Sequence, residues 1–347
     1  MIGKEHIVLV RLSAVGDVVL ATPVAARLRQ SYPRAEITWL VDPAFRELIA
    51  GNPAVDRITV FDHRGRHRGM AGIRRLAEEM GGVDLWVDLQ RKLRTVLLAS
   101  LLKPAERRTL VRRRGMAVLR ALVGRDPVLG APHQVLRNLS VLGLPPLGEE
   151  LPCPSPTMAL SEPVRAKAEE MIACTRHRGP LIGVFCGAAH ATKNWPVPHV
   201  ARFADRCLRE GLGVALLGGR REEPLVQSIV KAMNTQPTLV HAGGGLAFLA
   251  GLLAHCRAVV SPDSGPGHMA AALGVRVVSL FGSTSPQRWA PVGPHCRVVR
   301  NQLGCSPCSN HGRARCPLNT LECMWGLDPE KVWEAMTPLL AEPSLKN

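Results

Sequence analysis

Two series of short apolar runs, separated by helix-length segments, constrain the fold of this sequence more than any other feature. In the first half, the runs cover residues 6–12, 36–42, 57–62 and 83–89. In the second half, they cover residues 181–187, 213–219, 238–243, 257–263 and 276–282. Apolar strands that alternate with helices form parallel sheets covered by helices on both faces. The sequence therefore predicts two doubly wound α/β domains.

A proline-rich stretch separates the two series. Residues 143–156, GLPPLGEELPCPSP, contain five prolines and show no apolar periodicity, which is typical of a linker. We therefore expect domains at 1–155 and 156–347. Ligands of open parallel sheets bind beyond the carboxyl ends of the strands, so we expect the active site in a cleft between the two domains. The pattern of residues 17–33 predicts one helix that ends at Pro33.

The formal net charge of +16 indicates an anionic partner, which can be nucleic acid, a membrane surface or an acidic substrate. Aromatic residues make up only 4% of the chain, which disfavours single-stranded nucleic acid because such binding relies on stacking. Basic residues concentrate in 62–75, 91–94 and 106–114. These runs are either solvated surface or a face toward an anionic acceptor or phospholipid headgroups.

The sequence contains ten cysteines, whose state depends on the cellular compartment and on metal binding. Lys4 and Glu5 stand where a signal peptide needs an apolar core, so we expect a reducing compartment and no disulfide framework. No apolar stretch reaches the roughly 20 residues of a membrane-spanning helix. Four cysteines near the C-terminus have sulfur atoms that can bind zinc, but the second pair is more widely spaced than in a typical zinc site. Whether they bind a structural metal is left open: Cys305, Cys308, Cys316 and Cys323.

Three unusual loops follow predicted strands, and each has two interpretations. Asp17 in SAVGD is either a general base or an acid in the first turn of a helix. Thr192 and Lys193 lie in FCGAAHATKNWP, where they either bind phosphate or belong to a capped, solvated loop. Glu222 in LLGGRREEP either binds ribose hydroxyls or begins a helix.

The most unusual loop is SPDSGPGH, residues 261–268. Gly265 and Gly267 allow a ligand to approach the backbone, and the helix that follows presents free amides to an anion. Asp263 and His268 are placed to position a sugar or a diphosphate. Taken alone, His268 is better explained as a capping or core histidine.

Several of these motifs, in their order and spacing, resemble glycosyltransferase family nine, the ADP-heptose:lipopolysaccharide heptosyltransferases. They are RLSAVGDVVLATPVAARLRQSYP, KNWP, LLGGRREE, SPDSGPGHMAAALGVRVVSLFGSTSP and RWAPVGP. The cysteine-rich tail is similar to that of some second heptosyltransferases. The resemblance implies the GT-B fold, two Rossmann-like domains, with the acceptor bound by the N-terminal domain and the nucleotide sugar by the C-terminal one.

The resemblance also implies a reaction: inverting transfer of L-glycero-D-manno-heptose from ADP-heptose to Kdo or the first heptose of the lipopolysaccharide inner core. It makes Asp17 the catalytic base and implies neither a cofactor nor a catalytic metal, in keeping with the lack of an Asp-x-Asp motif. The donor would be bound by the residues that match the family's motifs: Thr192, Lys193, Glu222, Asp263, Ser264, Gly265, Gly267 and His268.

The resemblance gives the basic N-terminal half an anionic acceptor, for which we single out Arg64, Arg66, Arg94 and Arg137. It also implies a cytoplasmic enzyme held at the inner face of the inner membrane, with no nucleic-acid partner. Two alternatives stay open. One is a family-nine transferase that uses another sugar nucleotide. The other is a charge-driven nucleic-acid-binding protein, whose affinity would fall steeply with salt and would not depend on Asp17.

Overall fold

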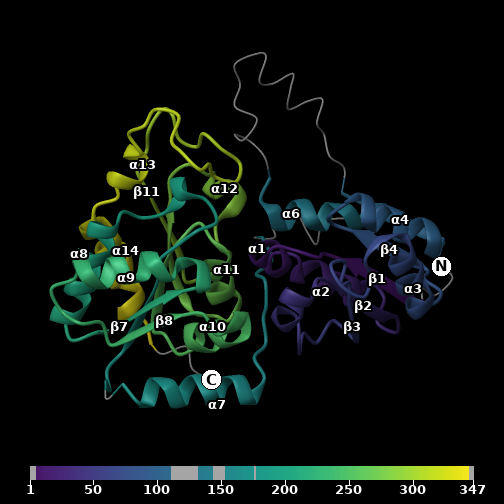
Figure 1. Cartoon of the computed structure of the whole chain (residues 1–347), viewed down its shortest axis with the longest axis horizontal. Coiled ribbons are helices and arrows are strands. Elements are labelled where there is room, and N and C mark those ends of the chain that lie inside the picture. Colours follow the sequence, from purple (N-terminus) through teal and green to yellow (C-terminus); the bar gives the residue numbers. More distant parts are fainter. Residues whose placement is uncertain (1–4, 111–131, 144–152, 176, 344–347) are drawn as a thin grey trace. The chain divides into compact units, whose positions relative to one another are not determined.

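The computed structural model describes residues 5–110, 132–143, 153–175 and 177–343. These residues form two compact units (Figure 1). The first unit comprises the described residues up to Leu110 and those of His133–Ala159. The second comprises Pro132 and the described residues from Leu160 onward. Most of the predicted linker and the end of the basic run 106–114 lie outside the described residues.

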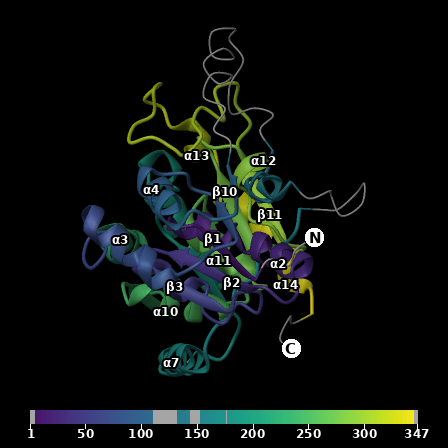
Figure 2. The same ribbon diagram turned by 90° about the vertical axis from the view of Figure 1, so that its right-hand side faces the viewer.

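The first unit is built on a five-stranded parallel sheet in the order β3-β2-β1-β4-β5. Its strands are β1 His6–Val10, β2 Glu36–Val41, β3 Arg57–Val60, β4 Leu85–Asp88 and β5 Glu106–Thr109. Its helices are α1 Val15–Val19, α2 Thr22–Ser31, η1 Pro43–Leu48, α3 Gly69–Met80, α4 Leu93–Leu102, α6 Gln134–Leu139 and η2 Ser140–Leu142. Apolar residues of α3 and α4 form a core with β1, β2 and β4 on one face, while α2 lies on the other side of the strands (Figure 2).

The second unit contains a six-stranded sheet, also parallel, in the order β11-β10-β9-β6-β7-β8. Its strands are β6 Leu181–Phe185, β7 Gly213–Gly218, β8 Leu239–Ala242, β9 Ala258–Pro262, β10 Arg276–Phe281 and β11 Cys296–Arg300. Its helices are α7 Glu162–Ala173, η3 Ala191–Lys193, α8 Val197–Arg209, η4 Arg220–Glu222, α9 Glu223–Ala232, α10 Gly245–Ala254, α11 Gly265–Ala272, α12 Pro286–Trp289, α13 Glu322–Trp325 and α14 Pro329–Ala341.

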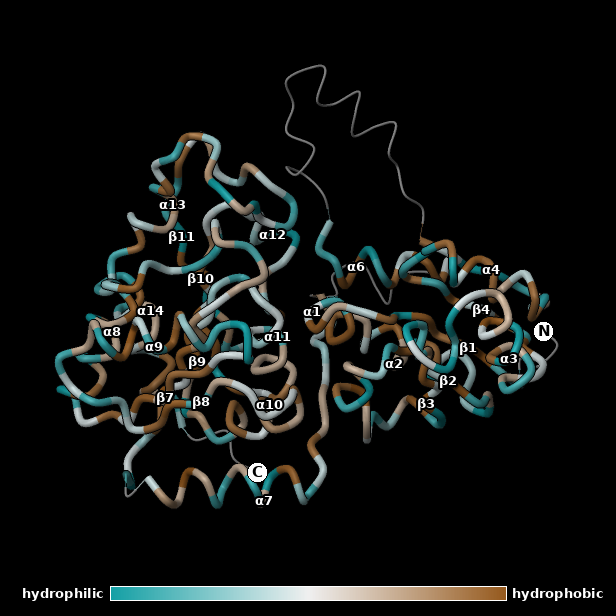
Figure 3. Tube along the Cα trace, in the orientation of Figure 1, coloured by the Kyte–Doolittle hydropathy of each residue, from teal (hydrophilic) through white to brown (hydrophobic). Residues whose placement is uncertain are grey.

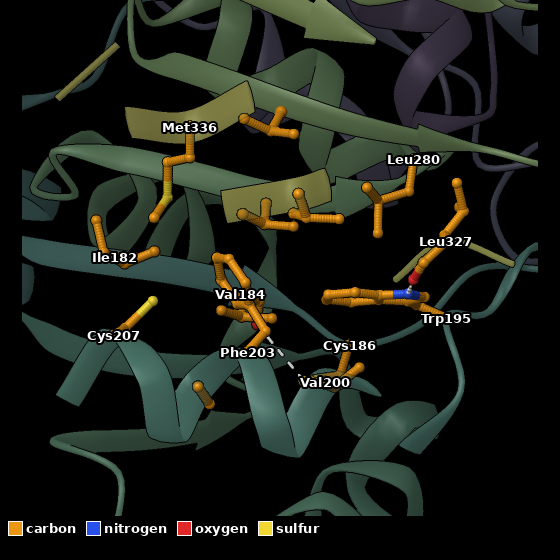
Figure 4. Packing of buried hydrophobic residues seen from close by; sticks show 14 of the residues in the cluster. Ile182, Val184, Cys186, Trp195, Val200, Phe203, Cys207, Leu280, Leu327 and Met336 are labelled. Carbon is orange, nitrogen blue, oxygen red and sulfur yellow. Dashed lines mark hydrogen bonds between the residues drawn. The ribbon is translucent and has the colours of Figure 1, made fainter. Parts of the chain in front are cut away.

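Helices cover both faces of this second sheet. Residues of α8, α9 and α14 form a buried core against β6, β7, β9 and β10, whereas α10 and α11 lie on the other side (Figure 1). The central strands are the most hydrophobic part of the unit (Figure 3). Trp195 belongs to this buried core and lies near the end of β6. Its indole N–H donates to the Leu327 carbonyl oxygen at 2.8 Å (Figure 4). The loop that precedes α8 is therefore anchored by a buried aromatic ring.

The predicted strands and the two doubly wound sheets are confirmed. The single helix expected over 17–33 is wrong, because the chain forms α1 and α2 instead. Pro23 lies in the first turn of α2 and has no amide hydrogen to continue a preceding helix, so a new helix begins there.

The strand order reverses once in each sheet. In the first unit, β1 has β2 on one side and β4 on the other; in the second, β6 has β7 on one side and β9 on the other. The loops after the two strands at such a reversal run apart over opposite faces, which leaves room for a ligand beyond the strand ends. The sheets therefore direct attention to the loops after β1 and β4, and to those after β6 and β9.

In the part of the chain that the structure describes, no helix is both long and apolar enough to cross a membrane.

The core of the second unit yields a stability prediction. Phe203 is fully buried, and its ring lies 5.7 Å from that of Trp195. Phe203→Ala leaves a cavity, so we expect the free energy of unfolding of this unit to fall by about 3–5 kcal/mol. Hydrogen exchange of β6 and α8 amides in denaturant measures this loss. The control Leu318→Ala, at a residue that is 60% exposed, should change it by less than about 0.5 kcal/mol. Equal effects of the two substitutions would contradict this packing.

Candidate active site

The strand reversal of the second unit brings two predicted loops together. The loop after β6 leads through η3 to Lys193, and the loop after β9 contains Asp263. The Lys193 ammonium lies 3.4 Å from the Asp263 carboxylate, and both side chains are nearly buried. Asp263 also accepts a hydrogen bond from the Thr284 hydroxyl at 2.7 Å. An ammonium group has three hydrogens, so Lys193 can be held by Asp263 and still donate to a bound anion.

Thr192 fastens this loop to a distant part of the chain. Its hydroxyl donates to the Arg313 carbonyl oxygen at 2.9 Å and accepts from the Arg313 amide at 2.8 Å. The same hydroxyl lies 3.2 Å from the Ser283 hydroxyl, and the Thr192 side chain is buried. These hydrogen bonds of Thr192 hold the loop in place and so fix the position of the neighbouring Lys193. The expected contact of Thr192 with phosphate stays a prediction.

The loop after β9 ends in the uncapped N-terminus of α11. The Ser264 hydroxyl bonds the Ser261 hydroxyl at 2.9 Å and does not cap the helix. Gly265 is the first helical residue and is only half-buried, whereas Gly267 and His268 in the same turn are buried. Amides in the first turn of a helix have no partners within the helix and attract anions. This end of α11 can therefore receive a phosphate or carboxylate.

Glu222 lies beside the loop after β6. Its carboxylate accepts from the Gly219 amide at 2.9 Å. A Cβ atom at Gly187 would lie 2.4 Å from the Glu222 Cγ, so the backbone of that loop passes directly against this side chain. Of the predicted donor-site residues, Glu222 is therefore placed next to the loop of Thr192 and Lys193, and its second carboxylate oxygen is not used in the Gly219 bond.

Asp17 lies at the strand reversal of the first unit. It is in the first turn of α1, directly after β1, and its side chain is 25% exposed. The Arg11 guanidinium contacts its carboxylate at 2.5 Å and also donates to the Leu89 carbonyl oxygen at 2.8 Å. Gln90, which follows β4, accepts from the Leu12 amide at 2.8 Å. The loops after β1 and β4 are thus tied together, and Asp17 is held in a fixed orientation.

The four arginines predicted to bind the acceptor come from three elements of the first unit. Arg64 and Arg66 lie in the loop before α3, Arg94 in α4 and Arg137 in α6. The Asp62 carboxylate accepts from the Gly65 and Arg66 amides at 2.9 and 3.1 Å. These amides, Arg66 first, hold the pKa of Asp62 below its usual value. The loop is therefore ordered by an ionised aspartate, although Arg66 itself pairs with Glu79.

The four late cysteines lie near one another: Cys305, Cys308 and Cys316 are in the loop between β11 and α13, and Cys323 is in α13. Burial, and to a smaller extent the neighbouring thiols of Cys308, Cys305 and Cys316, raise the pKa of the Cys323 thiol to about 11. The pKa of Cys316 is lowered because backbone amides, that of Leu321 first, donate to its sulfur. Within the described residues, no group of three or more His, Cys, Asp or Glu side chains is arranged to hold a metal ion.

Sequence reasoning missed the residues that support the site. Arg11 reads as an ordinary strand-end arginine, and Arg313 lies 121 positions from the threonine that it holds. Arg11 begins the RLSAVGD motif and Thr284 belongs to the GSTSP segment, so both carried a signal, although neither motif indicated a supporting role. An acid, a lysine and free helical amides at a strand reversal can bind an anionic ligand, and a carboxylate fixed beside an arginine can accept a proton.

Comparison with known proteins agrees with this chemistry. The family model "Glycosyltransferase family 9 (heptosyltransferase)" matches residues 73–317. Lipooligosaccharide heptosyltransferase 2 of Haemophilus ducreyi is 27% identical over 310 residues, which cover 85% of this chain and 88% of that protein.

Two solved structures share the fold over nearly the whole length. A glycosyl transferase family 9 protein from Veillonella parvula has a TM-score of 0.82 at 24% identity, covering 98% of both chains. The ADP-heptose LPS heptosyltransferase II of Escherichia coli has a TM-score of 0.75 at 24% identity, covering 97% of this chain and 98% of that one. The GT-B fold class predicted from the sequence is confirmed.

The thiols yield a prediction on reactivity. The lowered pKa of Cys316 gives it a larger thiolate fraction at neutral pH than an ordinary thiol has. The pKa values of the buried thiols Cys186 and Cys256 are raised to about 12. We therefore expect iodoacetamide to label Cys316 quickly and the other two only after unfolding, with slower labelling as the pH falls. Peptide mass spectrometry measures this. Labelling of Cys186 in the folded protein at the rate of Cys316 would contradict the assignment.

Proposed function

Since the chain belongs to glycosyltransferase family 9 and is therefore a glycosyltransferase, we propose that it transfers L-glycero-D-manno-heptose from ADP-heptose to the inner core of lipopolysaccharide. The observation that carries this proposal is the group at the strand reversal of the second unit. There, the Lys193 ammonium is held by Asp263, and the N-terminus of α11 that follows is uncapped, an arrangement suited to an anion. The heptosyltransferase names of the relatives support the donor and the acceptor class.

In this proposal the second unit binds the nucleotide sugar. Lys193 and the amides at Gly265 and Gly267 bind the diphosphate, as does Thr192 if its hydroxyl exchanges a partner. The carboxylate oxygen of Glu222 that is not bonded to the Gly219 amide binds the adenosine ribose, a role that an acid after a strand has in other nucleotide-binding sheets. Asp263, Ser264 and His268 position the heptose and the phosphate beside it. Asp263 does so while orienting Lys193.

The first unit supplies the acceptor and the base. Asp17 accepts the proton of an acceptor hydroxyl while the hydroxyl oxygen forms a bond to the anomeric carbon. The bond from that carbon to the diphosphate breaks on the opposite side, so the configuration inverts. The electron pair leaves with ADP, and Lys193 and the helix amides stabilise the charge. Arg11 is a positioning residue that holds Asp17. No divalent cation is needed in this scheme.

The acceptor is Kdo or the first heptose of the inner core. Both belong to molecules that carry carboxylates and phosphates, and the proposed contacts are Arg64, Arg66, Arg94 and Arg137. Such an acceptor accounts for a basic first unit without a nucleic-acid partner. Because it is lipid-anchored, the enzyme would work in the cytoplasm at the inner face of the inner membrane.

Donor binding is tested by isothermal titration with ADP, UDP and GDP. We expect the protein to prefer ADP. Lys193→Ala should weaken ADP binding roughly tenfold or more, because a charge-assisted contact to phosphate is lost. Lys231→Ala, at an exposed lysine of α9, is the matched control and should leave affinity unchanged. Preference for UDP or GDP would favour another family member's donor, and an unchanged Lys193→Ala affinity would remove Lys193 from the site.

The base is tested by Asp17→Asn in a transfer assay with ADP-heptose and lipid-linked acceptor. The amide cannot accept the proton, so we expect the transfer rate to fall by roughly 100-fold or more while ADP affinity stays the same. Asp42→Asn is the control, because Asp42 is a partly exposed aspartate of the same unit and asparagine can also cap η1. A transfer rate within a few-fold of wild type in Asp17→Asn would rule out this base.

A further inference from the structure

Helix α4 presents a row of large apolar side chains to solvent. Leu93 is 76% exposed, Val96 42% and Leu101 39%. Leu93 and Val96 are helical neighbours at i and i+3, and Leu101 lies about two turns beyond Leu93 at i+8. The three side chains therefore lie within one helix face about 140° wide, which also contains the exposed Ser100. The colouring of Figure 3 shows α4 as hydrophobic over most of its length. Single exposed leucines are common, but three large exposed apolar side chains on one helix face indicate an interaction surface. We refer to Leu93, Val96 and Leu101 as the α4 stripe.

The α4 stripe is not needed for packing in the first unit. The opposite side of α4 already packs on the sheet, where Thr95, Leu98 and Ala99 are buried. Leu98 and Ala99 belong to the core cluster that contains Trp86 and residues of α3. A polar side chain at the stripe positions would leave that core intact. The exposed leucines and valine therefore need an explanation outside the fold.

Cations surround the α4 stripe at both ends. Three cations, Arg91, Lys92 and Arg94, lie at the N-terminus of α4, and Lys103 follows its last residue. Arg107 lies in β5, where its guanidinium donates to the Ala99 carbonyl oxygen of α4. The sequence from Leu89 to Ala105 contains no acidic residue. The helix dipole favours anions at the N-terminus, so three cations there do not stabilise α4 itself. A row of apolar groups rimmed by cations matches one chemical surface, apolar chains beneath anionic headgroups.

We propose that α4 docks the protein on an anionic lipid bilayer, with Leu93, Val96 and Leu101 inserted at the headgroup boundary and the flanking cations on lipid phosphates. A second copy of the chain fits less well, because a symmetric contact would bring the cations of both copies together. Nucleic acid has no apolar layer to bury the stripe. The proposal extends the proposed function, since a lipid-linked acceptor requires an enzyme that reaches the membrane. Vesicle binding itself does not depend on that function.

The test is sedimentation of the full-length protein with vesicles of phosphatidylethanolamine and phosphatidylglycerol, and with phosphatidylcholine vesicles for comparison. We expect binding to the anionic vesicles only, reduced by high salt. The triple variant Leu93→Ser, Val96→Ser, Leu101→Ser should lower the partition coefficient roughly tenfold or more, since three inserted side chains lose apolar burial. The matched control is the triple variant Val240→Ser, Val298→Ser, Leu318→Ser, which replaces comparably exposed apolar residues of the second unit. We expect this variant to bind vesicles as the wild-type protein does.

Other occupants of the stripe give different results, and each would overturn the proposal. Equal vesicle binding by the triple variant and wild type would mean that charge alone acts or that another surface inserts. A dimer seen by sedimentation velocity and abolished by the triple variant would assign the stripe to a second copy. A lower melting temperature of the triple variant with unchanged vesicle binding would show that the chain itself covers α4. Because ADP titration is unaffected by any of these, failure here is separate from failure of the proposed function.

Discussion

The pairing of β6 with β9 is the constraint on which the candidate site depends. The two strands are 73 residues or more apart in sequence, yet Ile182 pairs with Ala258 and Val184 with Val260. The pairing of β6 with β9 is suited to a glycine at 183. A Cβ atom there would lie only 2.8 Å from the Cys256 sulfur, so one of the two groups would have to move. With the ladder formed, the two strands end side by side. The loops that follow them then bring Lys193 and Asp263 together, and no local preference of either loop has to do so.

The first unit uses the same arrangement for a different purpose. There β1 pairs with β4, and the loops beyond them are joined through Gln90 and through Arg11, which holds the carboxylate of Asp17. One unit thus fixes cationic and amide groups suited to a diphosphate, and the other fixes a carboxylate suited to a proton. In the proposed reaction these are the two charges that change, on the leaving group and on the attacking hydroxyl. Two units of the same fold type therefore have opposite electrostatic roles in the proposed reaction.

Much of the fold could be predicted because buried parallel strands leave long apolar runs in the sequence. The edge strand β5 has the sequence ERRT and pairs only with β4, so no such run marked it. The break between α1 and α2 was missed because apolar periodicity continues across it and only Pro23 marks the restart. In the site, the motifs located Asp17, Lys193 and Asp263. The hydrogen bonds between the Thr192 hydroxyl and Arg313 could not be predicted from the sequence. Their partners at Arg313 are the backbone amide and carbonyl, which every residue type except proline has.

A heptosyltransferase adds one heptose to its acceptor, so the mass of the acceptor is the decisive measurement of the proposed function. The wild-type protein is incubated with ADP-heptose and, in separate reactions, with Kdo-terminated and heptosyl-Kdo-terminated lipid A, and the products are analysed by mass spectrometry. We expect the mass of one of these acceptors to increase by that of one heptose. An unchanged mass on both, with folded protein that binds ADP, would contradict the proposed function and point to another glycosyl donor or acceptor.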